Sequence, residues 1–331
     1  MGRAEEDLHD QLLQRIAHHY FVGGMLQSDI AAVEHLSRPS VSRLLTEARE
    51  RGVVQFRIGP PVDRVPELET ELQRRAPLHA CIVSTGKPRA LYANSSRLGY
   101  VAARYLESQL SHVRLLGVAS SRSLSGVVES MVQAHRRDLT VIDLLGCLPG
   151  GRADRGRRTG SASVDGGGPN TARLIAAWLG ASFRALPAPF VHKTASSLEA
   201  ALSAAVVRET LELGPHSELA LVGVGSMKRF DGTGAYSPIP VKELDELETR
   251  GAVGHLCGHF LREDGSVLEP SGGPFLLGIA ADALRQIPQR LAVAAGWNKV
   301  RPIAAAIRGG LISELVTDQA TAASLVRLLH P

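Results

Sequence analysis

Apolar residues between positions 27 and 50 recur at the spacing of two short helices joined by a tight turn. Ile30 and Ala31 fall where the first helix packs on the second, and Leu36 turns inward at the corner. The second helix carries one apolar stripe at positions i, i+3, i+4 and i+7, formed by Val41, Leu44, Leu45 and Ala48. This pattern predicts a helix-turn-helix unit.

Local signals set the ends of the second helix. The hydroxyl of Ser37 can accept a hydrogen bond from a free backbone N–H of the first turn, and Pro39 is tolerated there because it has no amide hydrogen. The helix therefore starts near Arg38, and the stretch Glu47–Gly52 closes it with a glycine. The run VVQFRI at 53–58 alternates like a strand, which favours a wing beside the helix.

The polar face of this unit indicates binding to double-stranded DNA, because arginine, serine and glutamine side chains hydrogen-bond phosphates and base edges. We expect DNA contacts from Gln27, Ser28, Ser37, Arg38, Ser40, Ser42 and Arg43. The alternative is an amphipathic helical hairpin whose arginines are only solvated. On the first interpretation, residues 1–58 form a winged helix-turn-helix domain.

Net charge does not by itself indicate a nucleic-acid partner. The chain has a formal charge of +4, but residues 1–58 hold seven Arg against eight Asp and Glu, which is a net charge of −1. The acids gather in the first helix, whereas the arginines crowd around the second; these are Arg38, Arg43, Arg49 and Arg51. The field that attracts DNA is therefore local.

Length and composition fit a small module joined to one large domain. The 331 residues are 44% hydrophobic, yet no run reaches the roughly 20 apolar residues that a membrane-spanning helix needs. The first residues lack the basic-then-apolar order of a signal peptide, and Cys81, Cys147 and Cys257 are widely separated. We therefore expect a soluble cytoplasmic protein without a metal site, in which Cys147 and Cys257 are small core residues.

A stiff break, Gly-Pro-Pro at 59–61, ends the first domain, and a charged helical pattern at 62–76 follows it. We assign 59–77 to a linker and connecting helix, and 78–331 to the large domain. Strand-like apolar runs then alternate with helical patterns, and these runs lie at 80–83, 113–119, 139–145, 218–225 and 290–296. The alternation predicts an α/β fold with a parallel sheet flanked by helices.

Several stretches resemble the SorC family of bacterial, sugar-responsive transcription regulators, sometimes grouped with DeoR. In the first domain they are YFVGGMLQSDIA and SRPSVSRLLTEARERGVVQFRI. The likeness continues through LVGVGS at 221–226, AVGHLCGHFLREDG at 252–265 and the run at 291–329. The chain departs from the family at Glu34 and His35, where a leucine and a glycine are usual.

The resemblance implies a Rossmann-like effector domain, similar to the glucosamine-6-phosphate deaminase and ribose-5-phosphate isomerase group. It also implies a homodimer or homotetramer that binds operator DNA and a small phosphorylated sugar. In parallel sheets, ligands bind beyond the carboxyl ends of the strands, where loops and helix starts offer free N–H groups to anions. We therefore expect the effector to bind the segments that follow the predicted strands.

The first such segment is Ser120–Ser123, after the strand-like run at 113–119. The hydroxyls of Ser121 and Ser123 and the guanidinium of Arg122 can hold a phosphate. Because the family usually has a glycine-rich turn with a threonine here, we expect a reshaped pocket. The alternative is an ordinary serine cap on a surface helix.

The second segment is a glycine turn, Gly223-Val-Gly225-Ser226. A dinucleotide-binding fingerprint would need a third glycine at Lys228, so we exclude NAD and FAD and expect no cofactor. The turn lets the backbone approach a ligand closely, with Ser226 and Lys228 available to bind negative charge. The alternative is a tight turn followed by solvated basic residues.

Two further residues match polar positions of the family. Lys299 follows the strand-like run at 290–296 and corresponds to a lysine that the family places against an effector phosphate. Asn170 stands at a helix start, after a Gly-, Arg- and Ser-rich run at 150–168 that we interpret as a mobile loop and a lid over the pocket.

His255 replaces the acidic residue that the family uses to accept hydrogen bonds from sugar hydroxyls. A neutral imidazole can donate as well as accept, so the substitution is compatible with an acidic or oxidised effector. The alternative is a histidine packed beside His259 in the core of the domain.

The preferred hypothesis is a transcription regulator whose operator binding depends on the effector. An isomerase-like or deaminase-like enzyme is the second hypothesis, but its candidate acids and bases, Asp264, Glu269 and His255, have no catalytic spacing. The third is a DNA-binding scaffold with a decayed pocket, which the departures at Ser121 and His255 keep open.

Overall fold

The computed structural model describes residues 3–21, 23–54, 64–85, 93–147, 170–227, 239, 241–268 and 275–329. Its contacts divide the chain into two compact units, Met1–Pro60 and Pro61–Pro331. No helix in these described ranges is both long enough and apolar enough to cross a membrane.

The first unit packs the helices α1 (Arg3–Phe21), α2 (Gln27–Val33) and α3 (Arg38–Glu50) around a common core. The core contains the predicted residues Ile30, Ala31, Val41, Leu45 and Ala48. As predicted, α3 begins at Arg38, and the Ser37 hydroxyl accepts a hydrogen bond from the backbone N–H of Ser40 at 3.2 Å. The helix-turn-helix is confirmed, whereas residues 55–58 of the expected wing lie outside the described residues.

The corner between α2 and α3 accommodates both departures from the family. His35 has a φ of +53°, the left-handed conformation that ends many helices, and the N–H of Leu36 donates to the carbonyl of Ala31 at 2.9 Å. Glu34 points to α1, where its carboxylate accepts hydrogen bonds from Arg15 at 2.9 and 3.2 Å. That contact lowers the pKa of Glu34 and fixes the corner against α1.

The second unit is built on a seven-stranded sheet in the order β1-β13-β12-β6-β2-β3-β4, in which every neighbouring pair is parallel. The strands are β1 (Ala80–Ser84), β2 (Leu115–Val118), β3 (Thr140–Asp143), β4 (Ser182–Arg184), β6 (Leu219–Gly223), β12 (Gln289–Val293) and β13 (Glu314–Asp318). The predicted parallel sheet is confirmed. The run at 218–225 divides at Val224, because β7 (Gly225–Ser226) joins a different sheet.

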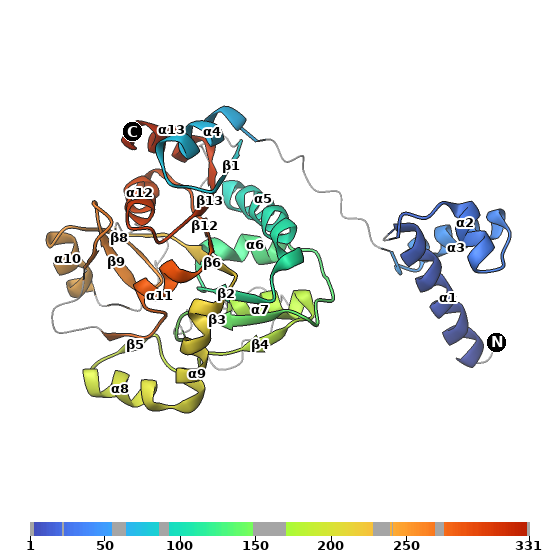
Figure 1. The fold of residues 1–331 in the computed structure, drawn as a ribbon, viewed down its shortest axis with the longest axis horizontal. Helices are drawn as coiled ribbons and strands as arrows, with labels where there is room; N and C mark the ends of the chain where they lie inside the picture. The colour runs from blue at the N-terminus through green and yellow to red at the C-terminus, as the bar shows by residue number, and fades with distance from the viewer. Residues whose placement is uncertain are drawn as a thin grey trace. The chain divides into compact units, whose positions relative to one another are not determined.

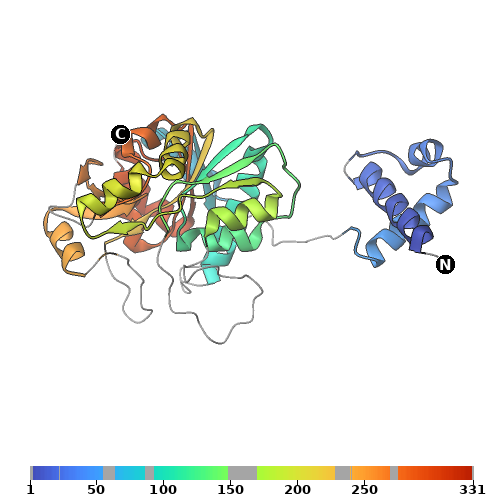
Figure 2. The same cartoon turned by 90° about the horizontal axis from the view of Figure 1, so that it is seen from below.

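Helices cover both faces of this sheet (Figures 1 and 2). One face packs against α5 (Ala93–Gln109), α6 (Ser125–Ser130) and α7 (Thr171–Leu179), and the other against α4 (Pro66–Arg75), α12 (Val300–Arg308) and α13 (Gln319–Leu328). In β1, the side chain of Ile82 packs on the face covered by α5, α6 and α7. The side chains of Cys81 and Val83 pack on the opposite face, which α4, α12 and α13 cover. A sheet buried on both faces needs strands that are largely apolar, which the sequence supplies in β1, β2, β3, β6 and β12.

Two small sheets extend the second unit. One is antiparallel and contains β7, β8 (Ala252–Leu256), β9 (His259–Arg262) and β10 (Val267–Leu268). The other pairs β5 (Val191–His192) with β11 (Phe275–Leu276). The remaining elements are α8 (Ala195–Ser203), α9 (Ala205–Leu213), α10 (Val241–Thr249), α11 (Ala281–Gln286), η1 (Leu110–His112), η2 (Arg122–Leu124), η4 (Gly214–His216) and η5 (Trp297–Lys299).

The helix that we assigned to a connecting segment, α4, packs on the second unit. Leu72 is fully buried in the core between α4, β1 and α13. Glu69 is buried too, and it accepts hydrogen bonds from the backbone N–H of Val83 at 2.8 Å and from Arg64. The contacts of α4 therefore hold it against β1, the edge strand of the sheet.

Cysteine burial follows the sequence prediction only in part. Cys257 is buried at the β8–β9 turn, but Cys147 is exposed, so its assignment to the core is wrong. The backbone of Cys147 donates to the carbonyl of Ala188 at 2.7 Å and accepts from the N–H of Phe190 at 2.9 Å. The backbone of Cys147 thus joins the end of the segment after β3 to residues 188–190, while its side chain is exposed.

We expect His35→Gly to stabilise the first unit by about 0.5–1 kcal/mol, because glycine adopts positive φ without the strain that a side chain causes. Hydrogen exchange of the α3 amides in the full chain measures this change, and His35→Ala is the matched control that retains the strain. Equal or lower protection in His35→Gly than in the parent chain would show that the corner is unstrained.

Candidate functional site

The carboxyl ends of β2 and β6 meet at the topological switch point of the seven-stranded sheet (Figure 1). From β2 the chain proceeds outward through β3 to β4, whereas from β6 it proceeds the opposite way through β12 to β13. Open parallel sheets bind ligands at such points. Ser120–Ser123 follows β2 and Gly225–Ser226 follows β6, so two of the predicted segments lie there.

The serine segment after β2 contacts residues at the carboxyl ends of β6, the adjacent strand, and of β12, the strand beyond it. The ammonium of Lys299, in η5 after β12, donates a hydrogen bond to the hydroxyl of Ser123 at 2.8 Å. A Cβ atom added to Gly223 would collide with the hydroxyl of Ser121, so the segment lies directly on the end of β6. The Ser121 oxygen is buried and has no hydrogen-bond partner among the described residues.

His255 reaches the same point from β8. Pairing of β7 with β8 places it opposite Gly225, where an added Cβ atom would collide with the imidazole. Burial, together with the nearby Lys299 ammonium, lowers the pKa of His255 to about 4. The imidazole is therefore neutral at neutral pH.

The alternative that His255 packs beside His259 is wrong. In the β8–β9 hairpin His255 pairs with Phe260, and their ring centroids lie 6.2 Å apart. His259 pairs with Leu256 and so belongs to the other face of the hairpin, where its Nε2 donates to the carbonyl of Ile279 at 2.8 Å.

Asn170 caps α7 and is tied to β3. Its Oδ1 accepts a hydrogen bond from the N–H of Arg173 at 2.9 Å, and its Nδ2 donates to Asp143 at 3.0 Å. Asp143 is only 4% exposed at the end of β3, and burial raises its pKa to about 6. These bonds give Asn170 a structural role, and its contact with an effector stays a prediction.

The structure thus brings five predicted residues to one edge of the sheet, which we call the switch-point cluster: Ser121, Ser123, Ser226, His255 and Lys299. Lys228, the side chain of Arg122 and the expected lid at 150–168 lie outside the described residues. Among the described residues, no group of three His, Cys, Asp or Glu side chains is placed to hold a metal ion.

Sequence reasoning missed Trp297 and Asp143. Trp297 is 68% exposed in η5, two residues before Lys299 and directly after Gly296, which has a φ of +124°. A large aromatic residue in the loop after a strand was the available signal for Trp297. For Asp143 the signal was a carboxylate at the end of an apolar run.

The predicted DNA contacts lie on the surface of the first unit. Exposed positions are Ser28, Ser37, Arg38, Ser42 and Arg43, and partly exposed ones are Gln27 and Ser40. Among the residues that the structure describes, neither Arg38 nor Arg43 forms an ion pair, whereas Arg51 pairs with Asp10 and Glu47. Arg38 and Arg43 are therefore available to a phosphate or a base edge.

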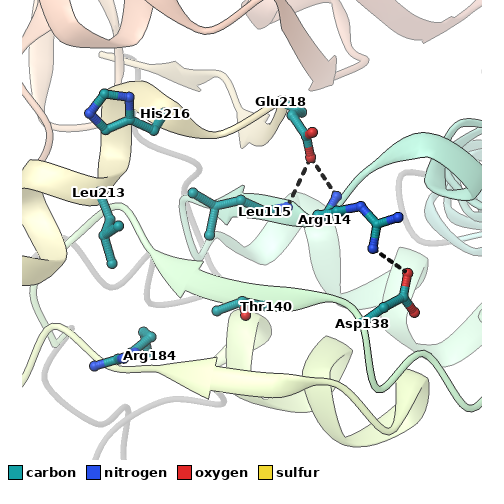
Figure 3. Close-up of a pocket in the computed structure, with 8 residues that line it drawn as sticks. All are labelled: Arg114, Leu115, Asp138, Thr140, Arg184, Leu213, His216 and Glu218. Atoms are coloured by element: carbon teal, nitrogen blue, oxygen red, sulfur yellow. Dashed lines mark hydrogen bonds and ion pairs between the residues drawn. The ribbon is translucent and has the colours of Figure 1, made fainter.

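A separate hollow lies at the opposite edge of the sheet, at the amino ends of β2 and β3 (Figure 3). The Glu218 carboxylate there accepts hydrogen bonds from the backbone N–H groups of Arg114 and Leu115, and Arg114 pairs with Asp138 at 3.7 Å. Both carboxylates, Glu218 and Asp138, thus already have partners, and none of the predicted effector residues lines the hollow. We therefore place the candidate site at the carboxyl edge.

The chain matches the family model described as "Putative sugar-binding domain" over residues 61–327. It is 30% identical over 332 residues to the erythritol catabolism regulatory protein EryD of Brucella abortus, with 97% of this chain and 98% of that protein covered. It is 28% identical over 328 residues to the transcriptional regulator LsrR of Escherichia coli K12, with 96% and 95% covered. Its fold is similar to that of the full-length sorbitol operon regulator SorC from Klebsiella pneumoniae, with a TM-score of 0.68 at 23% identity, covering 96% of this chain and 99% of that one.

The raised pKa of Asp143 predicts a pH-dependent stability. The folded chain holds this proton more tightly than the unfolded chain does, so the free energy of unfolding should fall as the pH rises from about 4 to about 7. Asp143→Asn should remove a part of this fall on the order of 2–3 kcal/mol, because it removes the buried charge.

Urea unfolding of both proteins across that pH range measures the difference. Asp138→Asn is the matched control: Arg136 lowers the pKa of Asp138 to about 2, so this carboxyl is already ionised over most of that range and its removal should leave the fall in place. An identical pH dependence of Asp143→Asn and the parent chain would contradict the prediction.

Proposed function

We propose that this chain, which belongs to the SorC family of sugar-binding transcriptional regulators, binds operator DNA through α3 and is controlled by a phosphorylated sugar at the switch-point cluster. The relatives EryD and LsrR are named as regulators, which fits sugar-modulated DNA binding. The phosphate on the effector, the assembly and the residue roles are the new parts of the proposal.

The observation that carries the effector part is the hydrogen bond from Lys299 to Ser123 at the switch point. An ammonium held beside serine hydroxyls at the carboxyl edge of a parallel sheet is suited to bind a phosphate. The Ser121 hydroxyl, which has no hydrogen-bond partner in the described part of the chain, supplies one more donor. A phosphorylated ligand satisfies all three groups at once.

The DNA part is supported by the exposed start of α3. Arg38 and Arg43 are exposed, and α3 is fixed by its Ser37 cap and by the buried stripe that packs on α1 and α2. A rigid helix with exposed guanidinium groups on one side fits the major groove. Ser42 lies on the exposed side as well.

Control of DNA binding requires that the effector bind two arrangements of the protein with different affinity. We propose a cytoplasmic homodimer or homotetramer, assembled chiefly through the second unit, in which the effector changes how paired α3 helices are held. Helix-turn-helix proteins read two half-sites as dimers, so such a change alters operator affinity without any contact between effector and DNA.

An isomerase-like or deaminase-like activity has less support. Asp264 accepts hydrogen bonds from the backbone and side chain of Ser266 in the β9–β10 turn, and the pKa of His255 leaves it unprotonated at neutral pH. Glu269 lies outside the described residues. The described residues thus show no paired acid and base at the switch-point cluster.

A mobility-shift titration on the DNA upstream of the chain's own gene tests both halves of the proposal. The panel contains sugar phosphates, free sugars and sugar acids. We expect a specific shift that one class of phosphorylated ligand alters. No specific shift would refute the DNA part, and a shift that no phosphorylated ligand changes would refute the effector part.

Arg43→Ala should weaken operator binding by about 1–3 kcal/mol and relax sequence specificity, if the guanidinium reads a base edge. Arg43→Lys is the matched control, because it retains the charge but loses the bidentate geometry. Titrations against the operator and a scrambled sequence separate the two effects. Equal weakening on both sequences by Arg43→Ala would assign Arg43 to a phosphate instead.

Lys299→Ala should leave operator binding intact and abolish the response to the effector, because the ammonium lies in the switch-point cluster, beside Ser123. Mobility shifts with and without the active ligand measure this, and Trp297 fluorescence gives a direct binding signal from the neighbouring residue. Lys193→Ala, which removes an exposed lysine elsewhere, is the control. A full response in Lys299→Ala would remove Lys299 from the site.

A further inference from the structure

The switch-point cluster presents no carboxylate that is available to a ligand, as far as the structure describes that edge of the sheet. Two carboxylates follow strands there, and both already have partners. Asp143 accepts hydrogen bonds from Asn170 at 3.0 Å and from the N–H of Leu186 at 3.3 Å. Asp318 caps α13 through the N–H of Thr321 at 2.7 Å.

The groups that do face one another at this edge are cationic or neutral. They are the Lys299 ammonium, the His255 imidazole and the hydroxyl groups of Ser121 and Ser123. His255 forms no hydrogen bond with any described residue, and it is partly exposed. The ring can lie against Gly225 because the absence of a side chain at that glycine leaves room for it.

This arrangement favours a ligand with two negative groups over a ligand with one. A sugar hydroxyl can bind either a carboxylate or an imidazole, so it does not need His255. A ligand carboxylate would be repelled by an acidic residue at position 255, but it can accept the N–H of a neutral imidazole and is attracted by the ammonium of Lys299. The cluster thus discriminates by charge.

We propose that the effector is a phosphorylated sugar acid, whose phosphate lies at Ser121 and Ser123 and whose carboxylate accepts a hydrogen bond from His255, with Lys299 between the two anions. This inference rests on the proposed function, since it specifies the chemistry of the ligand at the same site. The lowered pKa of His255 supports it, because the free protein keeps the ring neutral next to Lys299.

The test is calorimetric titration of the full-length chain with matched pairs of ligands. Each pair joins an aldonic acid phosphate to the alditol phosphate of the same length and configuration: erythronate and erythritol 4-phosphates, ribonate and ribitol 5-phosphates, gluconate and glucitol 6-phosphates. Within a pair only a carboxylate and a hydroxymethyl group differ. Inorganic phosphate and the unphosphorylated acids complete the set.

We expect the acid of at least one pair to bind about 10- to 100-fold more tightly than its alcohol. This is the ratio of dissociation constants that one additional charge-assisted hydrogen bond produces. His255→Asp should reverse this preference, and His255→Gln, which keeps an N–H donor, should retain part of it. His112→Asp, at an exposed histidine in η1, should leave the ratio unchanged. Circular dichroism of each variant confirms that it is folded.

The outcomes separate this inference from the function on which it rests. Alcohols that bind as tightly as their acids, or an unchanged ratio in both folded His255 variants, would overturn the sugar acid and leave the phosphorylated effector standing. If no phosphorylated compound binds while an unphosphorylated sugar acid does, both the phosphate site and this inference fall.

Discussion

The arrangement of the candidate site depends on two glycines that bring backbone and side chains into close contact. At Gly223 the missing side chain leaves room for Ser121, and at Gly225 it leaves room for His255. Any other residue at either position would displace a group from the end of β6. Because both glycines adjoin the switch point, the loop after β2 and the β8 strand can approach Lys299 together.

The same edge of the sheet combines structural and ligand-facing polar groups, and their partners distinguish them. Asp143 and Asn170 bond to each other and hold the start of α7, so burial of that carboxylate costs stability while it positions a helix. Lys299 and His255 lie close enough for the ammonium to lower the pKa of the imidazole, so this part of the edge brings a positive and a neutral donor together. A site with this composition is preorganised to bind an anion.

Much of the fold could be predicted from the sequence, because its signals are local. The cap at Ser37 and the apolar stripe of α3 are both set within about four residues, and five of the seven strands are continuous apolar runs. The edge strand β4 and the strand β13 were missed. β4 has three residues and an exposed pattern, and β13 mixes charged and polar residues, Glu314, Thr317 and Asp318, with apolar ones.

The sequence by itself determined the helix-turn-helix, the parallel sheet and the identity of the residues that follow each strand, because periodicity, caps and glycine turns act over short separations. Only the tertiary structure decided which of those residues meet. Lys299 and Ser123 are 176 positions apart, and strand order alone brings their loops together. The division of one apolar run at Val224, the burial of Asp143 and the neutral state of His255 likewise depend on neighbours distant in the chain, whose positions no local pattern specifies.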